Sequence, residues 1–183
     1  KHIGYVNNLL NSLSTKSFYQ NVIHGDPKLS NFLFDVKYKY VVSLIDLDTV
    51  SSGCLLTDLA DCIRSICNLA GENNNVCFDI TVFKYFLNGY FAIYEKGNND
   101  SFTYLLEFIY LIIIELTVRF LTDFLQSNRY FKIKYETHNL YRAEVQYKLL
   151  SSFLMKIPLL LDELNEIGIY PGSTFVSDVQ KFV

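Results

Sequence analysis

The chain has 183 residues, half of them hydrophobic, with a formal net charge of −3 and a sequence pI near 5.6. A chain of this length can bury a substantial core as one domain. Because binding to a phosphate backbone requires clustered Lys and Arg, the mild negative charge argues against a nucleic-acid partner.

The first predicted element is an amphipathic helix over residues 5–13. Two β-prone runs follow at residues 32–35 and 40–45, and their separation by four residues predicts a β-hairpin. This hairpin would bring Asn31 and Asp46 close together. If its second strand continued through Asp48, then Asp46 and Asp48 would share one face of the strand.

The segment before the hairpin is the most informative part of the chain. Residues 24–31 read HGDPKLSN, and Asp46 lies at the end of the apolar run that follows. A carboxylate, an amide five residues later and a second carboxylate after a strand are typical of a phosphotransferase. In such chemistry Asp26 would accept the proton of an acceptor hydroxyl. Asn31 and Asp46 would supply the hard oxygen ligands that Mg²⁺ prefers.

Four helices are predicted after the hairpin. Residues 58–69 form the first, with Thr57 or Asp58 suited to capping its start. The others cover residues 78–94, 102–126 and 139–156, and Pro158 marks a boundary after the last. The helix over 102–126 is predicted to be the buried central helix rather than a membrane span, because only seven uncharged residues separate Glu107 from Glu115.

Charged residues on these helices allow two interpretations each. Asp61 and Arg64 lie three positions apart and form either a surface ion pair or a brace for the metal-binding loop. Glu115, Arg119 and Asp123 recur every four residues, either as a ladder within the helix or with Arg119 and Asp123 reaching a substrate pocket.

Some residues near these helices are weaker candidates for the pocket. Arg142 begins the last predicted helix, where most such residues are structural. The aromatic residues of the preceding loop, Tyr130, Phe131 and Tyr135, are further candidates to line an acceptor pocket.

Residues 22–31 and 43–46 resemble the catalytic and metal-binding loops of the aminoglycoside and choline phosphotransferase superfamily, which has a protein-kinase-like fold. A narrower similarity, to the N-acetylhexosamine 1-kinases, is found in residues 46–50, 58–64, 119–125, 130–133, 138–142 and 146–149. The resemblance extends over residues 22–68 and 112–155. It implies ATP-dependent phosphorylation of the anomeric hydroxyl of an N-acetylhexosamine, with Mg²⁺ and ATP.

Position by position, the resemblance implies that Asp26 is the base and that Asn31 and Asp46 bind Mg²⁺. Asp48 stands where protein kinases have glycine, so it would help to bind metal or orient the loop. His24 is expected to hold the loop by packing and hydrogen bonds. Arg119, Asp123 and Arg142 are the expected substrate contacts, and Asp61 and Arg64 would support the site.

The predicted fold is therefore α+β and mainly α, the C-terminal lobe of a kinase-like protein over residues 1–183, with a β-hairpin that carries the metal site. The N-terminal nucleotide-binding lobe of such kinases, with its phosphate-covering loop, lysine and glutamate, is not recognised before His24. That lobe is an expected partner, beside ATP and the sugar.

Three alternatives remain open from the sequence. The first is a kinase for an aminoglycoside or an amino alcohol such as choline. The second is a non-catalytic binding lobe. The third, a metal-dependent hydrolase using His24, Asp26, Asp46 and Asp48, gives Asn31 no role.

The cellular location follows from the cysteines. Cys54, Cys62, Cys67 and Cys77 contain no Cys-x-x-Cys pair, so neither zinc nor a disulfide framework is expected. Such cysteines are typical of a reducing compartment, which predicts a cytoplasmic protein without a membrane partner.

Overall fold

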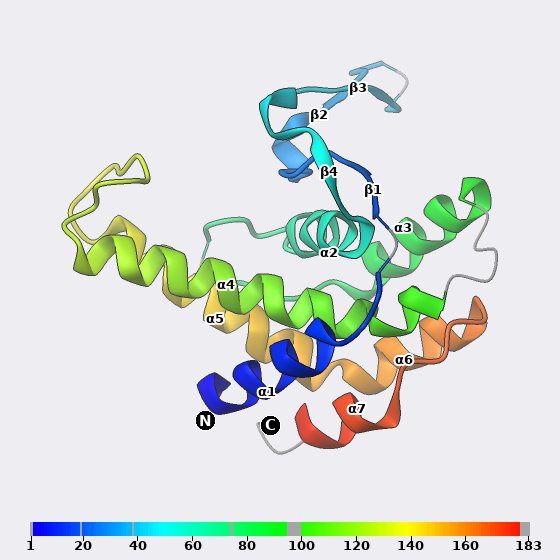
Figure 1. The fold of residues 1–183 in the computed structure, drawn as a ribbon. Helices are drawn as coiled ribbons and strands as arrows, with labels where there is room; N and C mark the ends of the chain where they lie inside the picture. The colour runs from blue at the N-terminus through cyan, green and yellow to red at the C-terminus, as the bar shows by residue number, and fades with distance from the viewer. Residues whose placement is uncertain (1, 19, 38, 74, 95–99, 180–183) are drawn as a thin grey trace.

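The structure is a computed structural model that describes residues 2–18, 20–37, 39–73, 75–94 and 100–179 (Figure 1). In chain order its elements are α1 (His2–Ser14), β1 (Gln20–Ile23), η1 (Leu29–Asn31), β2 (Phe32–Phe34), β3 (Val41–Leu44), η2 (Leu47–Thr49), β4 (Ser51–Cys54), α2 (Leu55–Ile66), α3 (Ile80–Ile93), η3 (Asp100–Tyr104), α4 (Leu105–Leu125), α5 (His138–Met155), α6 (Ile157–Glu166) and α7 (Ser173–Val179).

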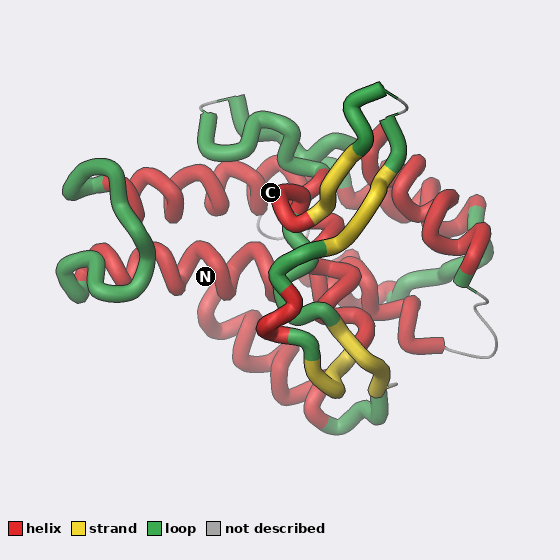
Figure 2. Tube along the Cα trace, turned by 90° about the horizontal axis from the view of Figure 1, so that it is seen from above, coloured by secondary structure: helices red, strands yellow, loops and turns green. Residues whose placement is uncertain are grey.

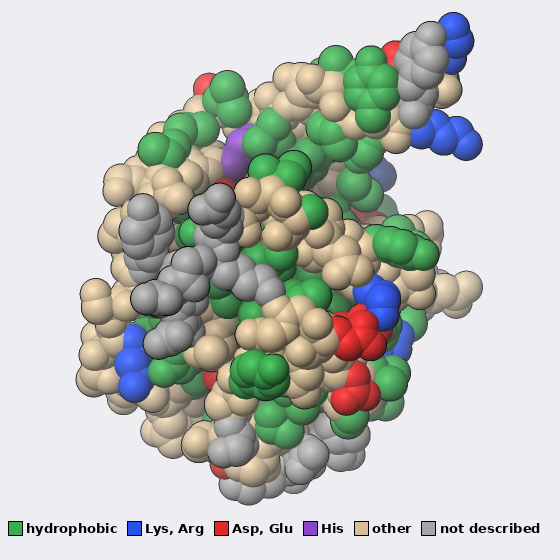
Figure 3. Space-filling model, turned by 90° about the vertical axis from the view of Figure 1, so that its right-hand side faces the viewer, with side chains coloured by type: hydrophobic (Ala, Val, Ile, Leu, Met, Phe, Trp, Pro, Cys, Tyr) green, Lys and Arg blue, Asp and Glu red, His purple; other side chains and the backbone are tan. Residues whose placement is uncertain are grey.

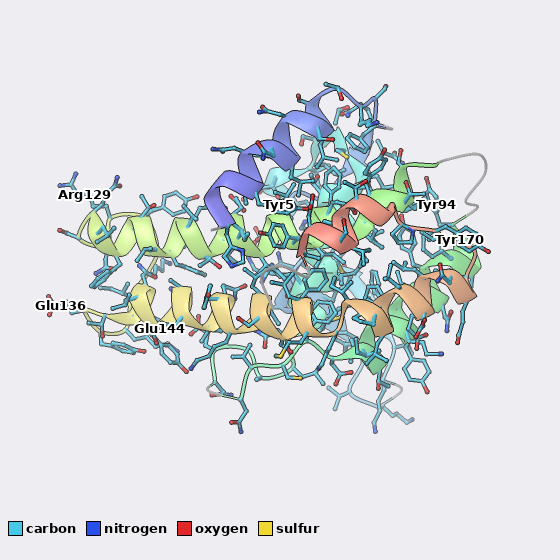
Figure 4. All side chains as sticks on the ribbon, turned by 90° about the horizontal axis from the view of Figure 1, so that it is seen from below. Tyr5, Tyr94, Arg129, Glu136, Glu144 and Tyr170 are labelled. Atoms are coloured by element: carbon cyan, nitrogen blue, oxygen red, sulfur yellow. The ribbon has the colours of Figure 1, made fainter. Side chains whose placement is uncertain are left out.

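The core is formed by helices that surround α4. This helix lies beside α5 along most of its length, and α2 packs on it from the side of the sheets (Figures 1 and 4). Ile109 and Ile113 of α4 are fully buried, as are Ile63 of α2 and Leu149 of α5. Because the first half of α4 is apolar on nearly every side, it needs cover from several helices, and α1 and α7 complete it.

Two antiparallel sheets of two strands each lie above α2 in Figure 1 and are drawn in yellow in Figure 2. β1 pairs with β4, with Ile23 opposite Ser51, and β2 pairs with β3, with Phe32 opposite Leu44. The hairpin is therefore enclosed in sequence by the strands of the other sheet. As a result, the two segments that join the sheets, residues 24–31 and 45–50, emerge next to each other.

Most of the predicted elements are confirmed. The hairpin forms from the two β-prone runs, and helices cover the segments predicted near residues 5–13, 78–94, 102–126 and 139–156. The mainly helical α+β class is also confirmed. Among the residues that the structure describes, no helix combines the length and apolarity that a membrane crossing requires.

Two predictions around the hairpin are wrong. Strand β3 ends at Leu44, and Asp46 adopts the left-handed conformation (φ 66°, ψ 55°) before the short helix η2. Asp46 and Asp48 therefore do not share the face of one strand. Helix α2 begins at Leu55 rather than Asp58, and no side chain caps it: the Thr57 hydroxyl donates to the carbonyl oxygen of Cys54.

The hairpin and the segment that follows it expose an unusual number of large hydrophobic side chains. Figure 3 shows the hairpin as an arm at the top of the molecule with such side chains along it. The exposed hydrophobic residues of this region are Leu33, Phe34, Val36, Tyr40, Val41, Val42, Ile45, Leu47 and Val50. Two strands alone bury too little apolar surface to cover these side chains themselves.

Candidate active site

His24 joins the end of β1 to the segment after the hairpin. Its side chain is buried, and its Nε2 lies 2.9 Å from the carbonyl oxygen of Ile45. Its Nδ1 accepts from the backbone N–H of Asp26 at 3.2 Å, so the hydrogen bonds assign the proton to Nε2. The Thr49 hydroxyl donates to the His24 carbonyl oxygen at 2.7 Å. His24 thus makes the kind of contacts expected for a residue that holds the loop.

Asp58 holds the same loop from α2. Its two carboxylate oxygens accept from the backbone N–H groups of His24, at 2.9 Å, and of Gly25, at 2.8 Å. Gly25 has a φ of +85°, and a Cβ added there would lie 2.7 Å from the carbonyl oxygen of Thr49. Only glycine fits this position without displacing Thr49. Sequence reasoning predicts only a capping role for Asp58, because its partners lie more than 30 residues away.

The candidate base and metal ligands are brought together around Lys28. The Lys28 ammonium group forms an ion pair with Asp26 and lies 3.9 Å from Oδ2 of Asp46. Asn31 is buried, and its Nδ2 donates to the Asp26 carbonyl oxygen at 2.8 Å. The backbone carbonyl oxygen of Asn31 in turn accepts from Ile45 at 2.9 Å. Lys28, which sequence reasoning did not single out, is the cation of this cluster.

The donor set of this cluster fits magnesium. Within the described ranges, no group of three or more His, Cys, Asp or Glu side chains could hold a metal ion. Mg²⁺ needs less than that, since it usually takes one or two carboxylates and completes its shell with water and substrate phosphates. Because Asn31 uses its Nδ2 toward Asp26, its Oδ1 is left to join the Asp46 carboxylate as a ligand. No hydrogen bond or ion pair with a described residue links Asp48 to the cluster.

A cleft of about 1270 Å³ opens beside this cluster. It runs from the loop after β1, along α2, to the end of α4 and the start of α5. Ligand sites in proteins typically have about 300 to 1,000 Å³, so this cleft has room for an acceptor and part of a second substrate. The residues of the predicted site that line it are Asp26, Asp61, Arg64, Arg119 and Arg142, together with Lys28, Tyr130 and Phe131.

Asp123 does not line this cleft. Its carboxylate is buried and accepts from the backbone N–H groups of Tyr130, at 2.8 Å, and Phe131, at 2.9 Å, and from Nδ2 of Asn139 at 2.8 Å. Burial acts to raise the pKa of Asp123, but the backbone N–H groups outweigh it and lower the pKa. The structure thus gives Asp123 a role in fixing the loop between α4 and α5, and its contact with substrate stays a prediction.

Arg119 is separated from Asp123 and faces the cleft. It pairs with Glu115 at 3.4 Å, and both side chains are about half exposed. Its guanidinium carbon also lies 5.7 Å from the ring centre of Tyr130 and 5.5 Å from that of Phe131. The predicted three-residue ladder is therefore reduced to one pair, and Arg119 stays available at the cleft wall.

Arg142 is held at the cleft wall by several partners. Its Nε donates to Glu72 at 2.6 Å and its Nη1 to the Lys132 carbonyl oxygen at 3.0 Å. Glu72 also lies 3.1 Å from His138. Burial acts to raise the pKa of Glu72, but the hydrogen bonds from Arg142 and His138 outweigh it and lower the pKa. These contacts connect the turn after α2 to the start of α5.

Asp61 and Arg64 pair with each other at 2.7 Å, and Arg64 is buried. Neither of them makes a hydrogen bond to the catalytic loop in the described part of the chain. The bracing of that loop comes instead from Asp58 and from Ser65, whose hydroxyl oxygen accepts from the backbone N–H of Leu29 at 2.8 Å.

Comparison with known families agrees with this arrangement. Residues 6–96 match the family model APH, described as "Phosphotransferase enzyme family". The matched stretch includes both sheets, the loop with Asp26 and Asn31, and helix α2. The match supports the superfamily of aminoglycoside and choline kinases, and with it a kinase-type enzyme that transfers phosphate from ATP to a small molecule.

Proposed function

We propose that this chain is the catalytic and acceptor-binding lobe of a kinase that phosphorylates the anomeric hydroxyl of an N-acetylhexosamine. One observation carries the proposal. The carboxylate of Asp26 lines a large cleft and is connected through Lys28 to Asp46, beside the buried amide of Asn31. This is the set of groups that phosphoryl transfer to an alcohol requires.

Each residue has a defined task in this proposal. Asp26 orients the acceptor hydroxyl and accepts its proton as the new bond to phosphorus forms. Asn31 and Asp46 would hold Mg²⁺, with Asp48 near the end of the loop as an auxiliary acid. When bound, the metal ion neutralises negative charge on the phosphates. Lys28 keeps a positive charge beside both carboxylates, which lets two acids lie close together in the same loop.

A second lobe would complete the nucleotide-binding site. The exposed hydrophobic residues of the hairpin support this part of the proposal, because a hydrophobic patch on a small protein is usually covered by a partner. A nucleotide-binding lobe packed on β2 and β3 would cover these side chains. It would also supply the phosphate-binding lysine that such kinases carry.

The choice of a sugar rests on the sugar-kinase-like segments and on the charges of the cleft. Four of the five acids that line it pair with a base: Asp61 with Arg64, Glu115 with Arg119, Glu72 with Arg142, and Asp26 with Lys28. The fifth, Asp58, accepts from two backbone N–H groups. A polycationic aminoglycoside or choline would need unbalanced negative charge in the cleft. A neutral sugar, bound by hydrogen bonds, fits the balanced charge better.

The experiment is phosphorus NMR of this chain together with the nucleotide-binding lobe that would cover the hairpin, with Mg²⁺, ATP and one acceptor at a time. The acceptors are N-acetylglucosamine, N-acetylgalactosamine, choline and kanamycin. We expect a sugar 1-phosphate signal that is lost in Asp26→Asn and kept in Asp162→Asn, the same change at an exposed position on α6. Exclusive use of choline or kanamycin would overturn the sugar assignment. Unchanged turnover in Asp26→Asn would overturn the role of the base.

A further inference from the structure

Two residues that line the cleft each have a buried amide oxygen with no hydrogen-bond partner. The oxygens are Oδ1 of Asn68, in the loop after α2, and Oε1 of Gln146, on α5. Both residues line the cleft, and their exposed fractions are 8% and 6%. Among the described residues only one other buried side-chain atom, Oε2 of Glu107, is unpartnered, and Glu107 does not line the cleft.

An unpartnered buried oxygen is unfavourable. Leaving such a group desolvated costs about 1 to 3 kcal/mol, so native proteins pair nearly all of them. Two such oxygens on residues that line the same cleft, one in the loop after α2 and one on α5, indicate a ligand that completes them. Asn68 already uses its Nδ2, which donates to the Gly71 carbonyl oxygen at 3.0 Å, so its free atom is an acceptor.

The charged groups that line the cleft beside these amides indicate which kind of ligand fits. The three Arg residues that line the cleft are each paired with a carboxylate. Asn68 and Gln146, in contrast, each keep one amide oxygen without a partner in the described part of the chain. The terminal torsion of a glutamine rotates easily, so Gln146 can present either its oxygen or its nitrogen.

We propose that Gln146, with Asn68 in the loop after α2, determines acceptor specificity by hydrogen bonding to neutral hydroxyl or amide groups. The proposal rests on the proposed function, since it names the groups that select the sugar in that cleft. A sugar hydroxyl both donates and accepts, and an acetamido group offers one N–H and one carbonyl oxygen. The quaternary ammonium of choline has no N–H to donate, and its single hydroxyl is the group that reacts, so choline would leave both oxygens unpaired.

The test measures binding without ATP, so that it is independent of phosphate transfer. N-acetylglucosamine is titrated into the chain and followed by saturation-transfer NMR and calorimetry. Gln146→Met keeps the length of the side chain and removes its amide. Gln126→Met makes the same change at the exposed end of α4, outside the cleft, and serves as the matched control.

We expect Gln146→Met to weaken sugar binding roughly fivefold to tenfold, the loss of about one hydrogen bond. Gln126→Met should bind like the unchanged chain. Gln146→Glu, which retains an acceptor oxygen, should bind better than Gln146→Met. Thermal unfolding of each variant confirms that it is folded, so that a weaker affinity reports recognition rather than loss of structure.

Three outcomes would overturn the proposal: equal affinity in Gln146→Met and the unchanged chain, no sugar binding by the unchanged chain, or binding of choline alone. Failure of the proposed function is seen separately. If sugar binding depends on Gln146 but no sugar phosphate forms, then the proposed reaction fails and the recognition stands. If sugar phosphate forms with the same kcat/KM in Gln146→Met, then the recognition fails and the reaction stands.

Discussion

At the scale of single residues, Asp58 anchors the start of the loop of residues 24–31. It receives two backbone N–H groups, from His24 and Gly25, on its two carboxylate oxygens. In Asp58→Asn only one oxygen remains to accept, and the amide nitrogen faces an N–H group. We expect this change to lower the free energy of unfolding by about 1 to 3 kcal/mol. Urea unfolding of the two proteins measures the difference.

The control for this prediction is Asp162→Asn, which makes the same change on the exposed face of α6. It should alter the free energy of unfolding by less than about 0.5 kcal/mol, as surface substitutions usually do. If both variants unfold alike, then the loop is held by His24 and Ser65 without Asp58. We also expect Asp58→Asn to reduce turnover, because Asp26 follows directly after the two anchored N–H groups.

At the scale of elements, the sequence predicts what depends on neighbours along the chain. The apolar spacing of α1, α3, α4 and α5 is local, and so is the alternation that produces the hairpin. The cluster of Asp26, Asn31 and Asp46 could be predicted for the same reason, because the hairpin alone brings its two ends together.

The rest depends on pairs that lie far apart in sequence. β1 pairs with β4 across more than 25 residues, and that pairing orients α2 so that Asp58 meets the loop. No pattern among neighbouring residues in the sequence predicts such a pairing. The left-handed conformation of Asp46 also ends strand β3 early, although the apolar run continues to Ile45 and Leu47. Gln146 and Asn68 could not be singled out, since only the folded cleft shows that their oxygens lack partners.

The loop between α4 and α5 gives a prediction at this scale. Asp123 accepts from the backbone N–H groups of Tyr130 and Phe131 and from the side chain of Asn139. Asp123→Ala removes all three acceptor contacts at once. We expect the amide hydrogens of Tyr130 and Phe131 to exchange with solvent much faster in this variant, while those of the core of α4 keep their protection.

Glu144→Ala is the control for the loop, because Glu144 is exposed on α5 close to the same end of the helix pair (Figure 4). It should leave the exchange rates of Tyr130 and Phe131 unchanged. Equal exchange in Asp123→Ala and the unchanged chain would mean that the aromatic contacts of Arg119 with these rings hold the loop instead.

At the scale of the whole molecule, the cleft and the hairpin have different proposed roles, one toward the acceptor and one toward the nucleotide. The cleft lies between the loop of residues 24–31, α2 and the α4–α5 end, and residues of all three line it. The helical core beneath holds them at fixed distances, whereas the hairpin points away from it with its hydrophobic residues exposed (Figures 1 and 3). The acceptor side of the proposed reaction is therefore built within this chain, and the nucleotide side depends on what covers the hairpin.

Stability of the core depends on pH through Glu107, in the first turn of α4. This carboxyl group is buried, its Oε2 has no partner in the described part of the chain, and burial raises its pKa to about 7. In the unfolded chain the group ionises near its ordinary pKa of 4.5. Between these two values the folded state binds more protons than the unfolded state. Ionisation of Glu107 therefore destabilises the folded state increasingly as the pH rises from 4.5 to about 7.

Glu107→Gln keeps the shape of the side chain and removes its charge. At pH 8 both states of the unchanged chain carry the ionised group, so the full penalty, on the order of 3 kcal/mol, is present there. We expect the variant to be more stable than the unchanged chain at pH 8 and nearly equal to it at pH 5. Urea unfolding at pH 5, 6.5 and 8 measures this difference, and other titrating groups cancel because both proteins share them. An advantage of Glu107→Gln that stays constant with pH would show that Glu107 is ionised in the folded core throughout this range.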